Sequence, residues 1–274
     1  MKLFKLWWWL LPLYLIILLA TAPARWLSLA NDALPAGTHI TPLQGTLWRG
    51  TMNLQAQLPT GASLNLEQVE WQLSPLALLL GKLDLQLSIP AGNVFEGQVQ
   101  LVAASADEEL AAPAAEQGPE VGLQVLHLSG ELAGNVQAAV NQLRLPVPLT
   151  VAGEWQLQLD EYSNRNAASG RFCDSLQGTL DWTSSEIRLN QAWHALGDYR
   201  LHLGCTANQA ISATIKDNNW LGLIVDAEVQ GSMGRPQLSV AGSIKPTAQA
   251  PQPVAEMVSF IGQPDSQGRI PFNW

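Results

Sequence analysis

Residue types that could carry catalysis are present in the chain but are widely scattered. Asp160 and Glu161 are adjacent carboxylates at the end of an expected strand, where solvated charge is the usual explanation. The histidines lack the His-x-x-x-His spacing that would bring two imidazoles onto one metal ion. They are His39, His127, His194 and His202. Because the sequence also lacks a Gly-x-Ser-x-Gly, P-loop or dinucleotide fingerprint, it predicts no catalytic, metal or cofactor site.

The two cysteines, Cys173 and Cys205, are the next candidates for chemistry. Neither has a histidine at metal-ligand spacing, which disfavours a metal site. In an oxidising compartment such a pair forms a disulfide by default. The bond would close a loop of about 30 residues and add on the order of 3 to 4 kcal/mol. Two buried free thiols are the alternative.

Six tryptophans are spread along the chain between residues 48 and 220. Such residues usually pack in a core or form a rim, but a groove for an apolar ligand uses the same side chains. They are therefore the candidate surface for a protein partner or a lipid: Trp48, Trp71, Trp155, Trp182, Trp193 and Trp220.

The N-terminal segment indicates a membrane anchor. Leu6–Ala24 contains no charged residue, and its 19 residues just span a hydrocarbon core of about 30 Å as a helix. Lys2 and Lys5 precede it, so the positive-inside rule places the N-terminus in the cytoplasm and the rest of the chain across the membrane. A cleaved signal peptide ending at Ala22-Pro23-Ala24 is the alternative.

Composition limits the classes of partner. The 274 residues are 47% hydrophobic and 14% charged, with a formal net charge of -9. Such a length allows one large all-β domain or two smaller ones. Because phosphates would repel this acidic chain, we expect no nucleic-acid partner.

Alternation of apolar and polar residues predicts strands in five clear segments, each with one buried and one wet face. These are 83–89, 155–160, 199–205, 211–216 and 225–230. The predicted fold is mainly β, as a strongly curved antiparallel sheet or incomplete barrel, with a β-sandwich as the alternative. The apolar phase slips in Ser63–Ser74, which predicts a bulge near Glu67 or Gln68.

Helices are expected in two places. Ser74–Gly81 has an N-cap serine, a proline at the first position and a final glycine. Pro253–Gly262 could form the other, after a Pro- and Ala-rich linker. The acidic segment 104–120 indicates an exposed, mobile loop that divides the sheet into two halves. The predicted organisation is an anchor in 1–26, a β domain in 27–245, and a linker, short helix and tail in 246–274.

One phrase recurs. "LQGTLWRG" places a short strand bearing Leu47 between Gly45 and Gly50, and "LQGTLDW" repeats its beginning with Gly178. Glycine inside a strand pattern marks a bend, a bulge or a close backbone approach. Repeated bends would curl a long sheet, so the phrase is architectural rather than catalytic.

Over essentially its whole length the chain resembles the protein N family of the bacterial type II secretion system. The resemblance rests on the short N-terminal anchor, on both glycine phrases, and on two further stretches, "VEWQLSPLALLLGKLDLQLS" and "FIGQPDSQGRIPFNW". It implies a single-pass inner-membrane protein with a periplasmic domain, which is an accessory component of the machinery that exports folded proteins. The family brings no catalytic residues with it.

Two functions follow as expectations. In the first, the exported sheet is an interaction module that binds other secretion components through a sheet edge or its Trp-rich face. In the second, which rests on a more distant likeness to AsmA-type curved sheets, the apolar face binds or transfers lipid. An enzyme would need converging polar side chains that the sequence does not supply.

Overall fold

The computed structural model describes residues 11, 14, 17–26, 37–57, 63–105, 123–142, 150–165, 171–232, 235–260 and 262–273. Strands dominate this part of the chain, which confirms the mainly β prediction. In chain order the elements are β1 (His39–Gly45), β2 (Arg49–Gln57), β3 (Ser63–Leu73), α2 (Pro75–Leu79), β4 (Lys82–Ile89), β5 (Phe95–Ser105), β6 (Leu123–Asn135), α3 (Val136–Gln142), β7 (Val151–Asn164), β8 (Ser175–Leu189), β9 (Ala192–Cys205), β10 (Ile211–Ile215), β11 (Ile224–Ser232), β12 (Arg235–Ile244), α4 (Gln252–Ser259) and β13 (Ile270–Asn273).

All these strands form one antiparallel sheet of 13 strands, in which each strand pairs with the next along the chain. Across the described residues, β1 and β13 do not pair with each other, so the sheet stays open. The predicted curved antiparallel sheet is confirmed. The β-sandwich alternative is wrong, because successive hairpins extend a single sheet and build no second one.

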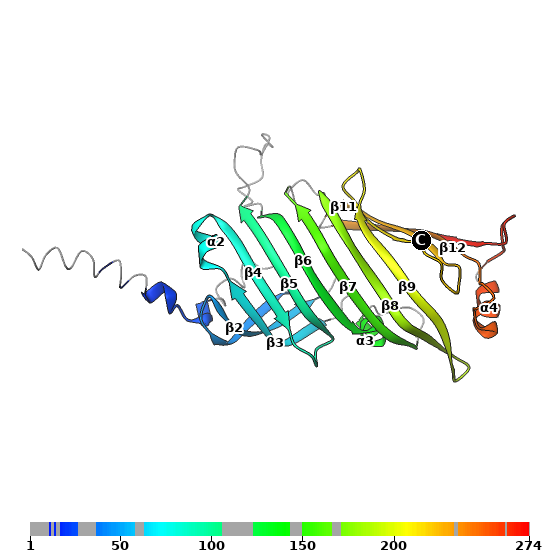
Figure 1. Ribbon diagram of the computed structural model, residues 1–274, viewed down its shortest axis with the longest axis horizontal. Coiled ribbons are helices and arrows are strands. Elements are labelled where there is room, and N and C mark those ends of the chain that lie inside the picture. Colours follow the sequence, from blue (N-terminus) through cyan, green and yellow to red (C-terminus); the bar gives the residue numbers. More distant parts are fainter. Residues whose placement is uncertain are drawn as a thin grey trace, which may run out of the picture.

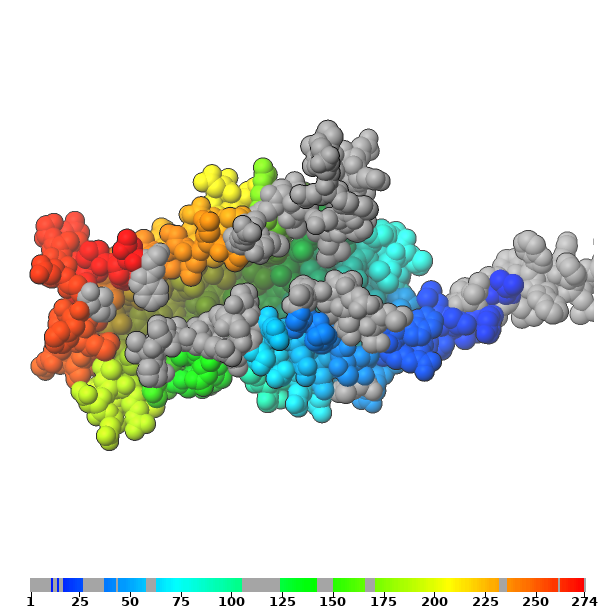
Figure 2. Space-filling model, turned by 180° about the vertical axis from the view of Figure 1, so that it is seen from behind, coloured from blue at the N-terminus to red at the C-terminus, as the bar shows by residue number. Residues whose placement is uncertain are grey.

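The sheet curls along its length. Strands β4 to β9 form a broad layer in Figure 1, and β2, β3 and β12 lie behind it. Seen from behind, the molecule is hollowed between the blue strands at one side and the orange strands at the other (Figure 2). One face of the sheet therefore turns inward.

The register places apolar residues on one face across eleven strands. One row, from β2 to β12, contains only glycine, alanine, valine, leucine and tryptophan: Gly50, Trp71, Leu87, Val99, Gly130, Leu159, Gly178, Leu203, Ala213, Ala227 and Val240. The neighbouring row on the other face is polar from β2 to β11: Thr51, Glu70, Ser88, Gln98, Glu131, Gln158, Thr179, His202, Thr214 and Asp226.

Exposure identifies the apolar face as the inner one. Leu87 and Leu159 are half-buried, whereas their sequence neighbours Gln86 and Gln158 are exposed. Side chains converge on the inside of a curved sheet and shield one another, and they diverge on the outside. The curvature therefore buries apolar surface that no second layer of described residues covers.

The predicted bulge is confirmed. Between flanking pairs, β2 contributes the single residue Asn53 and β3 contributes two, Glu67 and Gln68. Gln68 has a φ of 55°, and its backbone N–H donates to Asn53 Oδ1 over 3.1 Å. The extra residue lets Leu66 and Val69, three positions apart, both be buried.

Both predicted helices form. Ser74 caps α2 by accepting a hydrogen bond from the Ala77 N–H at 3.5 Å, and α4 buries Val254 and Val258. Helix α3 was not predicted, although Asn135 caps it by accepting a hydrogen bond from the Ala138 N–H.

Two predictions about the sheet are wrong. The acidic segment does not divide it, because β5 pairs with β6 across residues 106–120, which themselves lie outside the described residues. The segment 246–274 is not only a helix and tail, since its strand β13 pairs with β12 and extends the sheet.

The two glycine phrases have different structures. Leu47 lies in the turn between β1 and β2 rather than on a strand, so that expectation is wrong. Gly45 there has a φ of 116°, which favours glycine. Gly178 instead lies within β8, where a Cβ would come within 2.6 Å of the Gln158 carbonyl oxygen. The first phrase has the same close backbone approach, since a Cβ at Gly50 would come within 2.2 Å of the Gln44 carbonyl oxygen.

The predicted anchor is described only in part. Of Leu6–Ala24, residues 6–10, 12, 13, 15 and 16 lie outside the described residues, and residues 17–20 are helical. Among the residues that are described, no helix has both the length and the apolar character needed to cross a membrane.

Candidate interaction surface

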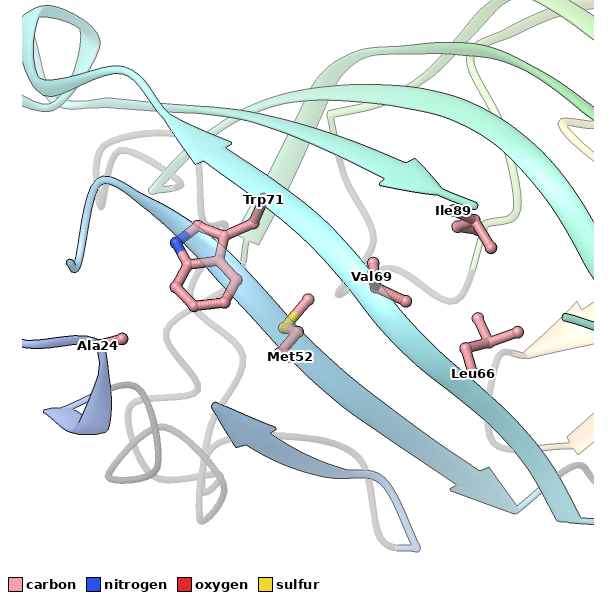
Figure 3. Packing of buried hydrophobic residues seen from close by; sticks show 6 residues of the cluster. All are labelled: Ala24, Met52, Leu66, Val69, Trp71 and Ile89. Atoms are coloured by element: carbon pink, nitrogen blue, oxygen red, sulfur yellow. The ribbon is translucent and has the colours of Figure 1, made fainter. Parts of the chain in front are cut away.

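Two groups of buried side chains lie at opposite ends of the apolar face. The N-terminal cluster, shown in Figure 3, consists of Ala24, Met52, Leu66, Val69, Trp71 and Ile89. The C-terminal cluster consists of Val136, Val151, Ile187, Leu196, Tyr199 and Val254. The candidate tryptophans divide between these clusters and their surroundings.

Trp71 and Trp48 belong to the N-terminal end. Trp71 is 4% exposed, and its Nε1 donates to the Leu47 carbonyl over 3.3 Å. Trp48 is half-buried in the β1–β2 turn and donates to the Leu19 carbonyl over 2.9 Å. Both indoles hold this turn in place, and Trp71 is too buried to touch a partner.

Trp155 and Trp182 lie in an aromatic row that leads to the C-terminal cluster. The row crosses β5 to β9 as Phe95, Gly134, Trp155, Trp182 and Tyr199. Ring centroids are 6.1 Å apart for Phe95 and Trp155, and 5.7 Å for Trp182 and Tyr199. Trp182 Nε1 donates to a backbone carbonyl, whereas the buried Nε1 of Trp155 has no partner within the described part of the chain.

Trp193 and Trp220 lie apart from the other four tryptophans. Trp193 is 46% exposed near the β8–β9 turn, and Trp220 packs over Gly197, where a Cβ would meet the indole at 2.9 Å. The six tryptophans therefore do not form one surface. Trp71 belongs to the N-terminal cluster, Trp155 and Trp182 pack against the C-terminal cluster, and the other three lie elsewhere.

Tyr199 is the titratable group of the C-terminal cluster. Burial raises its pKa to about 12, although a hydrogen bond from the Leu221 backbone opposes this shift. Its hydroxyl donates to the Leu196 carbonyl over 3.0 Å. The neutral phenol is thus part of the packing that closes this end of the sheet.

Between the clusters, the middle of the apolar row is only half-buried. Leu87, Val99, Leu159 and Leu203 all keep some exposure. No sequence pattern distinguishes these four residues from the apolar residues of the two clusters. Alternation shows which face of a strand a side chain is on, but not what covers that face. The strip offers an apolar ligand or partner contact along the sheet.

An open groove of about 1230 Å3 crosses β1 to β6 and overlaps the half-buried strip at Leu87 and Val99. Glycines and amides from both phases of the strands line it, including Gly50, Gly97 and Gly130 with Gln72, Gln86 and Gln98. Its lining is more polar than the half-buried strip, which suits hydrogen bonding to a polar chain rather than to acyl groups.

The sheet edges are the other candidate for interaction. Within the described residues, β1 and β13 each pair with one strand only. Pro42 lies in β1 and Pro271 lies in β13. Proline has no N–H to offer an added strand, so both edges are partly blunted.

The disulfide prediction is confirmed, because Cys173 and Cys205 are bonded with their Cα atoms 6.1 Å apart. The bond ties the segment before β8 to the end of β9. Among the histidines, His202 lies 2.8 Å from Asp217 with both side chains exposed. In the described ranges, no three residues of the types His, Cys, Asp and Glu gather as a metal site.

Comparison with known proteins places the chain in a family. Relatives of similar length are the type II secretion system proteins N of Aeromonas hydrophila (29% identical, covering 95% of this chain and 93% of the relative), Vibrio cholerae (25%, covering 92% and 89%) and Klebsiella pneumoniae (24%, covering 97% and 92%). No solved structure matches. The family model for type II secretion system (T2SS), protein N, matches residues 36–273, and the chain therefore belongs to that family.

Proposed function

We propose that this protein is an accessory scaffold of the type II secretion system, held in the inner membrane by Leu6–Ala24 with its curved sheet in the periplasm. Family membership supports the system, and the charge-free N-terminal run supports the anchor. The disulfide fits an oxidising compartment. The partners are other secretion components.

The half-buried apolar strip is the observation that carries the binding role. A partner element that packs on Leu87, Leu159 and Leu203 would complete the burial that the open sheet leaves unfinished. Strand addition at β1 or β13 is the weaker route, since each edge contains a proline.

Lipid binding is the second candidate function, and one specific observation favours it. The apolar row crosses β2 to β12 without a polar residue, so an acyl chain could lie along it without desolvating any side-chain polar group.

Photocrosslinking in cells tests the two candidates. A crosslinking residue replaces Leu159 on the inner face, with Gln158 on the outer face as the matched control. Adducts with secretion components at position 159 alone support the scaffold. Adducts with phospholipid or lipopolysaccharide there support lipid binding, and equal adducts at both positions would refute a specific inner-face site.

A further inference from the structure

Helix α2 carries a cluster of exposed leucines. The exposed fractions are 72% for Leu76, 40% for Leu78, 82% for Leu79 and 75% for Leu80, and none of the helical residues is buried. A contiguous apolar patch of this kind on a protein surface usually marks an interaction site. These leucines are not part of the half-buried strip, because α2 lies in the connection between β3 and β4 and not on the sheet.

Hydrogen bonds connect α2 to the end of the N-terminal helical turn, residues 17–20. Trp48 Nε1 donates to the Leu19 carbonyl over 2.9 Å, and the Trp48 carbonyl accepts from the Leu73 N–H at 2.7 Å. Leu73 ends β3, and the next residue, Ser74, caps α2. Through these two hydrogen bonds, Trp48 links the start of α2 to the C-terminal end of the predicted anchor.

Further contacts fix this arrangement. The Leu47 N–H donates to the Ala22 carbonyl over 2.8 Å, and Pro23 forms a β-bridge with Thr46. Both views place α2 at the same end of the molecule as the described N-terminal residues 17–26, with α4 at the other end (Figures 1 and 2). The membrane that holds the anchor is thus the apolar phase nearest to α2.

We propose that α2 inserts its leucines into the periplasmic leaflet of the bilayer that holds the anchor, as a second membrane contact. This inference rests on the proposed anchoring of Leu6–Ala24. Exposed Lys82 lies three residues after the end of α2, and Trp26, which follows the anchor, is 47% exposed. Cations and indoles of this kind suit the headgroup level beside an inserted apolar turn. The contact would hold the sheet in one orientation above the membrane.

The test uses the full chain in vesicles of phosphatidylethanolamine and phosphatidylglycerol, with or without nitroxide-labelled lipid. An environment-sensitive fluorophore is attached at Leu79→Cys, or at Phe260→Cys on α4 as the matched control, because Phe260 is 88% exposed at the opposite end. Leu18→Cys reports on the anchor. Since Leu79 and Phe260 are both exposed, neither substitution removes a packed side chain.

We expect lipid-borne nitroxide to quench the label at position 79 several-fold more than the label at 260, together with strong quenching at 18. Quenching at 18 with equal, weak quenching at 79 and 260 would overturn this inference and leave the anchor intact. If the label at 18 is not quenched, anchoring fails and the second contact fails with it. Because the vesicles hold no other protein, burial of α2 against a protein partner would appear as the second outcome.

Discussion

The two ends of the apolar face are closed in different ways. The N-terminal cluster is built from strands β2 to β4 and from Ala24, which backbone hydrogen bonds hold beside the β1–β2 turn. The C-terminal cluster needs two helices, because α3 supplies Val136 and α4 supplies Val254 from far along the chain. An open sheet can therefore bury its ends by curling on itself or by adding a separate cover.

The two clusters should differ in how cooperatively they unfold. Residues in a central strand cannot lose their packing without disturbing two neighbouring strands, whereas a docked helix can detach alone. We expect the N-terminal cluster to report global stability and the C-terminal cluster to open locally. Four measurements test this comparison.

The largest effect is expected for Trp71→Ala. The side chain is 4% exposed and its removal leaves a cavity between β2 and β3, so the free energy of unfolding should fall by about 3 to 5 kcal/mol. Denaturant unfolding measures the change. The control Gln72→Ala, an exposed neighbour on the same strand, should change stability by about 0.5 kcal/mol or less.

Val254→Asp should detach α4. The charge cannot stay in a site that is 1% exposed, and the lost burial of Val254 and Val258 corresponds to about 3 kcal/mol. Hydrogen exchange should show α4 unprotected while β3 to β5 keep their protection. Met257→Asp, at a 39% exposed position of the same helix, should leave α4 docked. Loss of protection along the entire sheet would contradict local opening.

Alkaline pH should weaken the C-terminal cluster through Tyr199. Its pKa is about 12 in the folded protein and about 10 in the unfolded chain, so the folded state holds its proton more tightly. The stabilisation is complete below pH 10 and is lost between about pH 10 and 12, by on the order of 1 to 2 kcal/mol. Unfolding curves against pH measure it, and Tyr199→Phe should remove most of the dependence in that window. An unchanged slope in the variant would rule Tyr199 out as its source.

The smallest effect is expected at the bulge beside the N-terminal cluster. Asn53→Ala removes the acceptor for the Gln68 N–H, which should cost about 1 kcal/mol. Thermal unfolding, compared with Gln55→Ala on the same face of β2, measures the difference. Equal stability of the two variants would show that the bulge keeps its shape without this hydrogen bond.

Sequence periodicity predicted the strands and the bulge well because both depend on neighbouring residues. A side chain two positions away shares a face, and a slip in the phase at Gln68 requires an extra residue. The pairing of Cys173 with Cys205 was also predictable, since the chain has no other cysteine. The continuity of the sheet across residues 106–120 was not predictable, because the composition of a polar insertion does not show whether the strands on either side of it pair.

The candidate surface depended on information that the sequence does not contain. Trp71 and Trp193 are both tryptophans within strands, yet Trp71 is buried in a cluster and Trp193 is 46% exposed. Burial is decided by which distant segments cover a position, and curvature brings such segments together only in three dimensions.

The sequence by itself determined the family, the mainly β class, the disulfide and the helical turn of Ser74–Gly81, because each depends on residue types and short spacings. Only the tertiary structure showed that this turn leaves Leu79 and Leu80 exposed beside the N-terminal segment. An apolar stretch can have the same sequence whether it packs in a core or is exposed to solvent. The physical reason is that exposure depends on the closing of the sheet around its inner face, which no local pattern encodes.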